Sequence, residues 1–127
     1  MPEKHLFEYA VIRIVPRVER EEFINAGVIV YCNRQRFLGV AYELNERRLL
    51  ALYPELDMEA LKEALDSFQR IAKGGPDAGP IGHLDTPSRF RWLTAIRSTV
   101  VQTSRVHPGL CTDAGRALDR LFEEMVS

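Results

Sequence analysis

Three stretches near the N-terminus are apolar on both faces of a strand pattern, and this feature constrains the fold more than any other. Residues 7–15 (FEYAVIRIV), 24–32 (INAGVIVYC) and 36–42 (RFLGVAY) are rich in β-branched and aromatic residues, which favour strands. Short connections favour antiparallel neighbours. We therefore expect a meander covered on both faces, the second face by the last helix or by a second subunit. In the first strand Phe7, Tyr9, Val11 and Val15 should share one face, and Ala10, Ile12 and Ile14 the other.

Helical patterns follow the three strands. Asn45 is expected to cap a short helix that stops before Pro54, and Asp57 a longer one that ends near a Gly-Gly pair. Thr86, which precedes a proline, and Thr112 are expected to cap two more helices. The sequence therefore predicts three to four helices.

The remaining segments supply one more strand and two irregular regions. Residues 99–104 predict a fourth strand, 107–109 a turn, and 74–85, with their glycines and prolines, a mobile surface loop. The order of elements predicts an α+β fold, an antiparallel meander sheet of about four strands with three to four helices packed on it. A length of 127 residues predicts that this is one domain over residues 1–127.

Composition narrows the class of protein. Charged residues make up 28% of the chain and the net charge is -1, which makes nucleic acid an unlikely partner. No apolar run approaches the roughly 20 residues that span a bilayer, and the N-terminus has no signal-peptide pattern. Cys32 and Cys111 fit neither a metal site nor a disulfide framework. We expect a cytoplasmic protein with no membrane association, metal or cofactor.

The interval from Thr86 to Thr112 contains basic residues and no acid. Guanidinium groups beside hydroxyl groups suit phosphate or carboxylate recognition. The structural alternative is that Arg89 and Arg91 pair with acids of residues 19–22, and we favour it because arginines often do no more than solvate a surface. The candidate ligand-binding residues of the interval are Arg89, Arg91, Arg97, Ser98 and His107.

Arg13 is the second candidate, because it lies in the middle of an apolar strand. An unpaired buried charge is costly, so it needs a partner. That partner is a glutamate, an aromatic surface under the arginine stem with the head in water, or a ligand in a cleft. Asn25 and Gly27 indicate a bulge in the next strand, with Asn25 as a further candidate ligand-binding residue.

Catalytic signatures are weak. His107 could act as a general acid or base, and Cys111, just before a helix start, could pair with it. The sequence contains no phosphate-binding glycine loop, no zinc-protease motif and no nucleophile elbow. No catalytic residue is therefore assigned.

Several of these segments also resemble a known bacterial family. Tyr9–Arg13 (YAVIR), Val15-Pro16 and Glu19–Ile29 (EREEFINAGVI) are similar to the domain of unknown function numbered three-zero-three-seven, and Arg89–Thr99 and His107–Gly109 fit it more loosely. The family has no settled activity to transfer. Similar proteins are often encoded beside a kinase-like protein of the HipA type, and the resemblance therefore implies that partner.

These observations lead to three functional expectations. The leading one is a small non-enzymatic binding or regulatory module that recognises a protein partner or an anionic group near Arg13, Arg97 and the helix of Arg89 and Arg91. The alternative is an enzyme that acts on a phosphorylated or nucleotide-like substrate with Arg97 and His107. A homodimer is also expected, because the doubly apolar strands offer more surface than so few helices cover.

Overall fold

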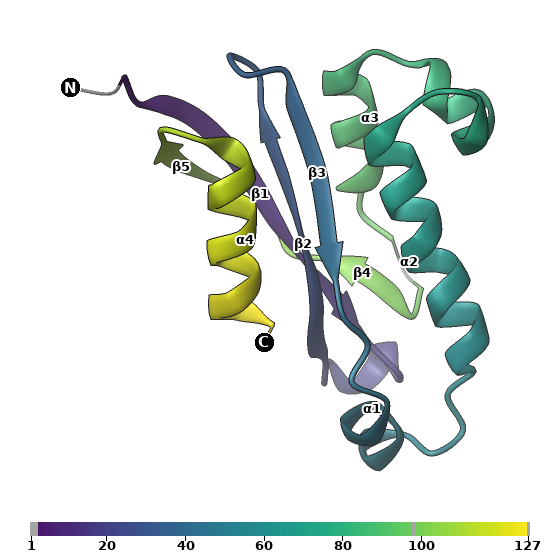
Figure 1. Ribbon diagram of the computed structural model, residues 1–127. Coiled ribbons are helices and arrows are strands. Elements are labelled where there is room, and N and C mark those ends of the chain that lie inside the picture. Colours follow the sequence, from purple (N-terminus) through teal and green to yellow (C-terminus); the bar gives the residue numbers. More distant parts are fainter. Residues whose placement is uncertain (1–2, 98, 127) are drawn as a thin grey trace.

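The computed structural model describes residues 3–97 and 99–126, which form one antiparallel sheet with helices on both faces (Figure 1). The strands are β1 (His5–Ile14), β2 (Ile24–Cys32), β3 (Phe37–Tyr42), β4 (Val101–Thr103) and β5 (His107–Cys111). The α-helices are α1 (Glu46–Leu52), α2 (Met58–Lys73), α3 (Thr86–Leu93) and α4 (Ala114–Met125). Two 3-10 segments, η1 (Val18–Arg20) and η2 (Pro76–His83), complete the elements. The expected α+β class is confirmed.

β1 is the centre of the sheet. The strand order is β3-β2-β1-β4, so the first three strands form the expected meander. β4 pairs with β1 at Ile12–Ile14, and β5 pairs with it at His5–Tyr9. Both lie along the edge that β2 leaves free, and together they act as one interrupted strand. The turn expected at 107–109 was wrong: Pro108 lies within β5, at an outer strand where proline is tolerated.

A bulge interrupts the pairing of β1 with β2, as expected. Ile12 pairs with Gly27, whereas Arg13 pairs with Asn25, so Ala26 is the extra residue. A Cβ atom on Gly27 would lie 2.6 Å from the backbone oxygen of Ala41 on β3. Glycine is therefore required here by the close approach of the neighbouring strand.

Each face of the sheet has its own apolar core. On one face Phe7, Val28 and Val30 pack with α4, and on the other Ile12 and Ile29 pack with the layer formed by α2 and α3. Figure 1 shows α4 lying alone on its side of the sheet. Of the two alternatives for the second face, the last helix or a second subunit, the structure shows the last helix covering it.

Two of the four predicted helix N-caps are at the expected residue, and the other two are one residue away from it. The side chains of Asn45 and Asp57 accept hydrogen bonds from the first turns of α1 and α2. Asp85 rather than Thr86 caps α3, and Asp113 rather than Thr112 caps α4. In both cases a carboxylate directly precedes or follows the threonine and takes the bond.

The stretch expected as a surface loop is η2. A hydrogen bond of 3.1 Å from Gly75 N to Gly82 O closes it, and its left-handed Gly79 separates two short 3-10 turns. No helix of the described residues is long and apolar enough to cross a bilayer.

Candidate functional site

The sheet divides the candidate residues into two groups. Arg13 and Asn25 are cross-strand partners, and Asn25 contacts α4, so both lie on the α4 side. His107 pairs with Tyr9 of the same side. The arginines of α3 and Arg97 lie on the opposite side with α2, and Ser98 is outside the described residues. The structure does not bring the candidates together at one point.

Arg89 is bound into the protein. Its Nη1 atom donates to the carbonyls of Ile71 and Ala72 at 2.8 Å each, and its Nε donates to Leu84 O at 3.1 Å. Its Nη2 donates to Thr86 Oγ1. These bonds satisfy carbonyls near the C-terminal end of α2, which otherwise lack intrahelical donors. The environment of Arg89 is that of a structural clamp between α2 and α3.

Arg91 is exposed and has no ion-pair partner among the described residues. Among the described residues, neither it nor Arg89 forms an ion pair with the acids of residues 19–22, of which Glu22 pairs with Arg20. The proposed structural pairing of these arginines is therefore not seen, although Arg89 reaches a structural role through carbonyls instead.

Arg97 lies at the C-terminal end of α3. It donates to Leu93 O at 2.8 Å and to Trp92 O at 2.7 Å. Its guanidinium carbon is 4.8 Å from the ring centroid of Trp92 and 5.1 Å from that of Phe68 on α2. Burial between these rings lowers the pKa of Arg97. The two bonds leave three of its five N–H groups for another acceptor.

Arg13 has no internal carboxylate partner. Among the described residues it makes no hydrogen bond or ion pair, and its buried Nε is without an acceptor. The guanidinium carbon instead lies 4.2 Å from the ring centroid of Phe23, which is 45% exposed. A cavity of about 350 Å³ adjoins the pair, lined also by Val18, Glu21 and Gln102. The aromatic contact of Arg13 is therefore made by the guanidinium itself rather than by the stem that the sequence suggested, and a cavity lies beside it.

Asn25 joins the Arg13 region to α4. Its Nδ2 donates to Met125 O at 3.1 Å, which satisfies a carbonyl of the last helical turn. Its Oδ1 is buried and has no donor. Arg13 of β1 and Asn25 of β2 are directly paired across the sheet. Each has one buried polar atom without a hydrogen-bond partner among the described residues: Nε of Arg13 and Oδ1 of Asn25.

His107 and Cys111 do not form a catalytic pair. The ring of His107 lies 5.3 Å from that of Tyr9, whereas the buried Cys111 packs in the α4 core. Burial raises the pKa of the Cys111 thiol, which is the opposite of what a nucleophile needs. Among the described residues, no cluster of three or more His, Cys, Asp or Glu side chains could hold a metal ion.

Sequence reasoning missed Phe23. The signal was present, because Phe23 is a large apolar residue that follows the charged run of residues 19–22. Such a residue is normally assigned to the strand core that begins one position later. The bulge at Ala26 shifts the side chains that precede it, and Phe23 is left on the surface under Arg13.

The fold and these surfaces define a class, a single-sheet α+β protein with an open arginine–aromatic site. The chain belongs to the family described as protein of unknown function (DUF3037), whose model matches residues 9–126. Neither a curated protein nor a solved structure matches it significantly. The resemblance noted in the sequence is thereby confirmed at the level of the family.

Proposed function

We propose that this protein is a non-enzymatic binding module that docks an acidic group of a protein partner on the Arg13–Phe23 site. The observation that carries the proposal is the guanidinium of Arg13, which lies on an exposed aromatic ring with no internal acceptor. Arginine and aromatic side chains dominate the energetic centres of protein interfaces.

The surroundings of Arg13 favour a protein over a polyanion. Glu21 lines the same cavity, so a highly charged phosphate chain or nucleic acid would meet a like charge there. Val18 is 44% exposed beside it and offers apolar contact surface. A single carboxylate set in an apolar partner surface would meet less repulsion from Glu21 than a polyanion, and its apolar surroundings would contact Val18.

The partner that the family resemblance suggests is a HipA-type kinase-like protein. The purified chain would be titrated with a HipA-type kinase-like protein by isothermal calorimetry. We expect Arg13→Ala and Phe23→Ala each to weaken binding at least tenfold, since truncation at an interface centre costs about 2 kcal/mol or more. Arg34→Ala, at an exposed arginine of the β2–β3 turn, is the matched control.

Unchanged affinity in both variants, with unchanged melting temperatures, would remove the Arg13 site from the proposal. The anionic-group version is tested separately by thermal shift with inorganic phosphate, citrate and AMP. A shift that Arg13→Ala abolishes would replace the protein partner with a small anion.

The enzyme alternative gains no support from the geometry. Arg97 contacts Phe68 of α2, whereas His107 contacts Tyr9 in the α4 layer, so the two side chains lie on opposite faces of the sheet. An acid–base group and a charge-stabilising group must both reach one reacting centre.

A further inference from the structure

A second site lies on the opposite face of the sheet, and it is independent of the proposed Arg13 interface. It is a groove of about 490 Å³ between α2 and the segment that leads into β4. Most of its walls are aliphatic: Leu56, Ala60, Leu61, Ala64, Val100 and Val101. The alanines leave the space open, because larger side chains at the same positions would fill it.

The groove is elongated. It follows α2 from Asp57 to Phe68, and eleven residues of α-helix span about 16 Å. A volume near 490 Å³ is typical of small-molecule sites. The aliphatic walls and this length suit an extended hydrocarbon chain.

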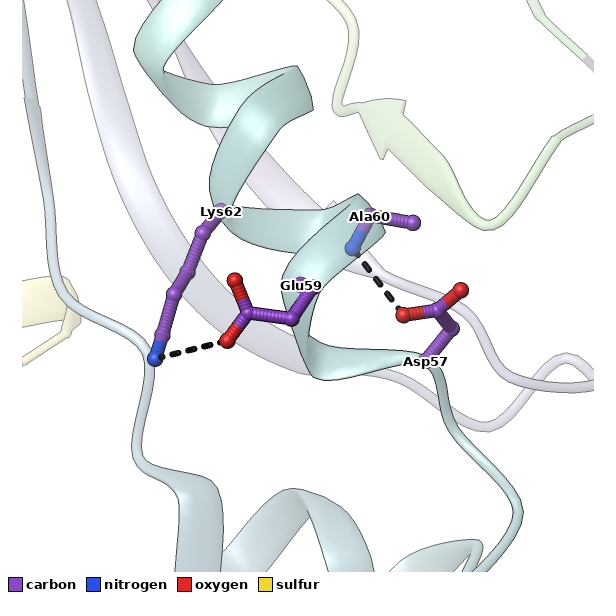
Figure 2. Close-up of polar contacts among 4 residues, drawn as sticks. All are labelled: Asp57, Glu59, Ala60 and Lys62. Carbon is purple, nitrogen blue, oxygen red and sulfur yellow. Dashed lines mark hydrogen bonds and ion pairs between the residues drawn. The ribbon is translucent and has the colours of Figure 1, made fainter.

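Among the described lining residues, charged side chains lie only at the two ends of the groove. The carboxylate of Asp57 is engaged, because its Oδ1 accepts from Ala60 N at 3.1 Å. Figure 2 shows that Glu59 and Lys62, which pair with each other at 3.7 Å, extend to the other side of α2. Arg97, at the Phe68 end, is the cation among the described lining residues and retains unused N–H groups.

We propose that this groove binds an elongated aliphatic carboxylate, with the chain against Ala60 and Ala64 and the carboxylate on Arg97. The guanidinium is held between two aromatic rings and two carbonyls, so it is oriented before the ligand arrives. Burial lowers the pKa of Arg97, and among the described residues no carboxylate forms an ion pair with it. Its charge is therefore available to an anionic ligand.

Trp92 gives a direct readout, because it is the one tryptophan of the chain and contacts Arg97. Its fluorescence would be titrated with octanoate, decanoate and dodecanoate below their micelle concentrations. We expect saturable binding that tightens roughly fourfold per added methylene until the groove is filled. Dodecanol should bind at least tenfold more weakly than dodecanoate.

Two variants separate the apolar and polar halves of the site. Ala64→Leu should fill the groove and weaken dodecanoate at least tenfold, whereas Ala51→Leu, at an exposed alanine of α1, should not. Arg97→Gln should erase the preference for the acid over the alcohol. Melting curves without ligand identify any variant that loses its fold. If Arg97→Gln unfolds, Ala64→Leu still tests the proposal.

Three results would overturn the proposal: no saturable binding, binding only at micellar concentrations, or equal binding by Ala64→Leu. A fourth result would replace the ligand with a second copy of the chain. In that case the native chain would bind no carboxylate but would self-associate, and Ala64→Leu would abolish the self-association. None of these results would bear on the Arg13 interface, because that site is tested on the other face.

Discussion

At the scale of single residues, the surroundings of each guanidinium decide its role. Arg89 has four oxygen acceptors, Arg97 has two carbonyls and two rings, and Arg13 has a ring alone. The sequence placed all three among the candidates because arginine in an apolar or acid-free stretch needs an explanation. It could not distinguish them, because each guanidinium also has contacts from another segment: the end of α2 for Arg89, Phe68 for Arg97 and Phe23 for Arg13.

Arg89→Ala should destabilise the protein strongly. It removes charge-assisted bonds and leaves the carbonyls of Ile71 and Ala72 without donors, which should lower the free energy of unfolding by about 2–4 kcal/mol. Urea denaturation measures this. Arg91→Ala, on the same helix but exposed, should change it by less than about 0.5 kcal/mol. Equal effects of the two substitutions would contradict the clamp assigned to Arg89.

At the scale of elements, local sequence signals predicted individual strands and helix caps better than they predicted which segments pair in the sheet. Residues 24–32 and the caps at Asn45 and Asp57 were predictable because strand composition and capping act within a few residues. β5 was missed because Pro108-Gly109 is a turn signal locally, and only pairing with β1 makes the segment a strand. The α4 cap was misplaced because two adjacent residues could each accept the bond.

The cap of α3 should make stability depend on pH. Hydrogen bonds from the side chain and backbone of Ser88 lower the pKa of Asp85 from its usual 3.8. A folded-state pKa below the unfolded one means that the stabilisation is present above about pH 4 and is lost as the pH falls through the lowered pKa.

Asp85→Asn keeps a neutral cap and should remove this dependence. The native chain should be the more stable of the two near neutral pH, and the difference should shrink as the solution is acidified below about pH 4. Urea denaturation over a pH series measures the difference. A gap that stays constant down to pH 3 would show that the charge of Asp85 plays no part in the cap.

At the scale of the whole molecule, the homodimer expected from the sequence stays a prediction, with a defined surface. Leu6 and Leu110 are paired across β1 and β5, and each is 60% exposed. Their neighbours Phe7 and Cys111 belong to the α4 core, so strand alternation points the two leucines away from α4. No helix of the described residues buries this pair.

Light scattering after size exclusion should therefore give twice the monomer mass of 14.5 kDa at micromolar concentration. Leu110→Glu should shift the population to the monomer, because it places a charge in the apolar contact. Val106→Glu, at a residue outside the strands, serves as the comparison. A native chain that elutes and scatters as a monomer at all concentrations would refute the prediction.

The position of β1 between early and late partners also affects how the protein is made. β2 and β3 leave the ribosome soon after β1, whereas β4, β5 and α4 are synthesised some ninety residues later. Until then the nascent chain carries one open strand edge and one bare apolar face, which is the state most exposed to aggregation. Contacts this distant along the chain also slow folding, so a chaperone would matter most in the interval before β4, β5 and α4 have been synthesised.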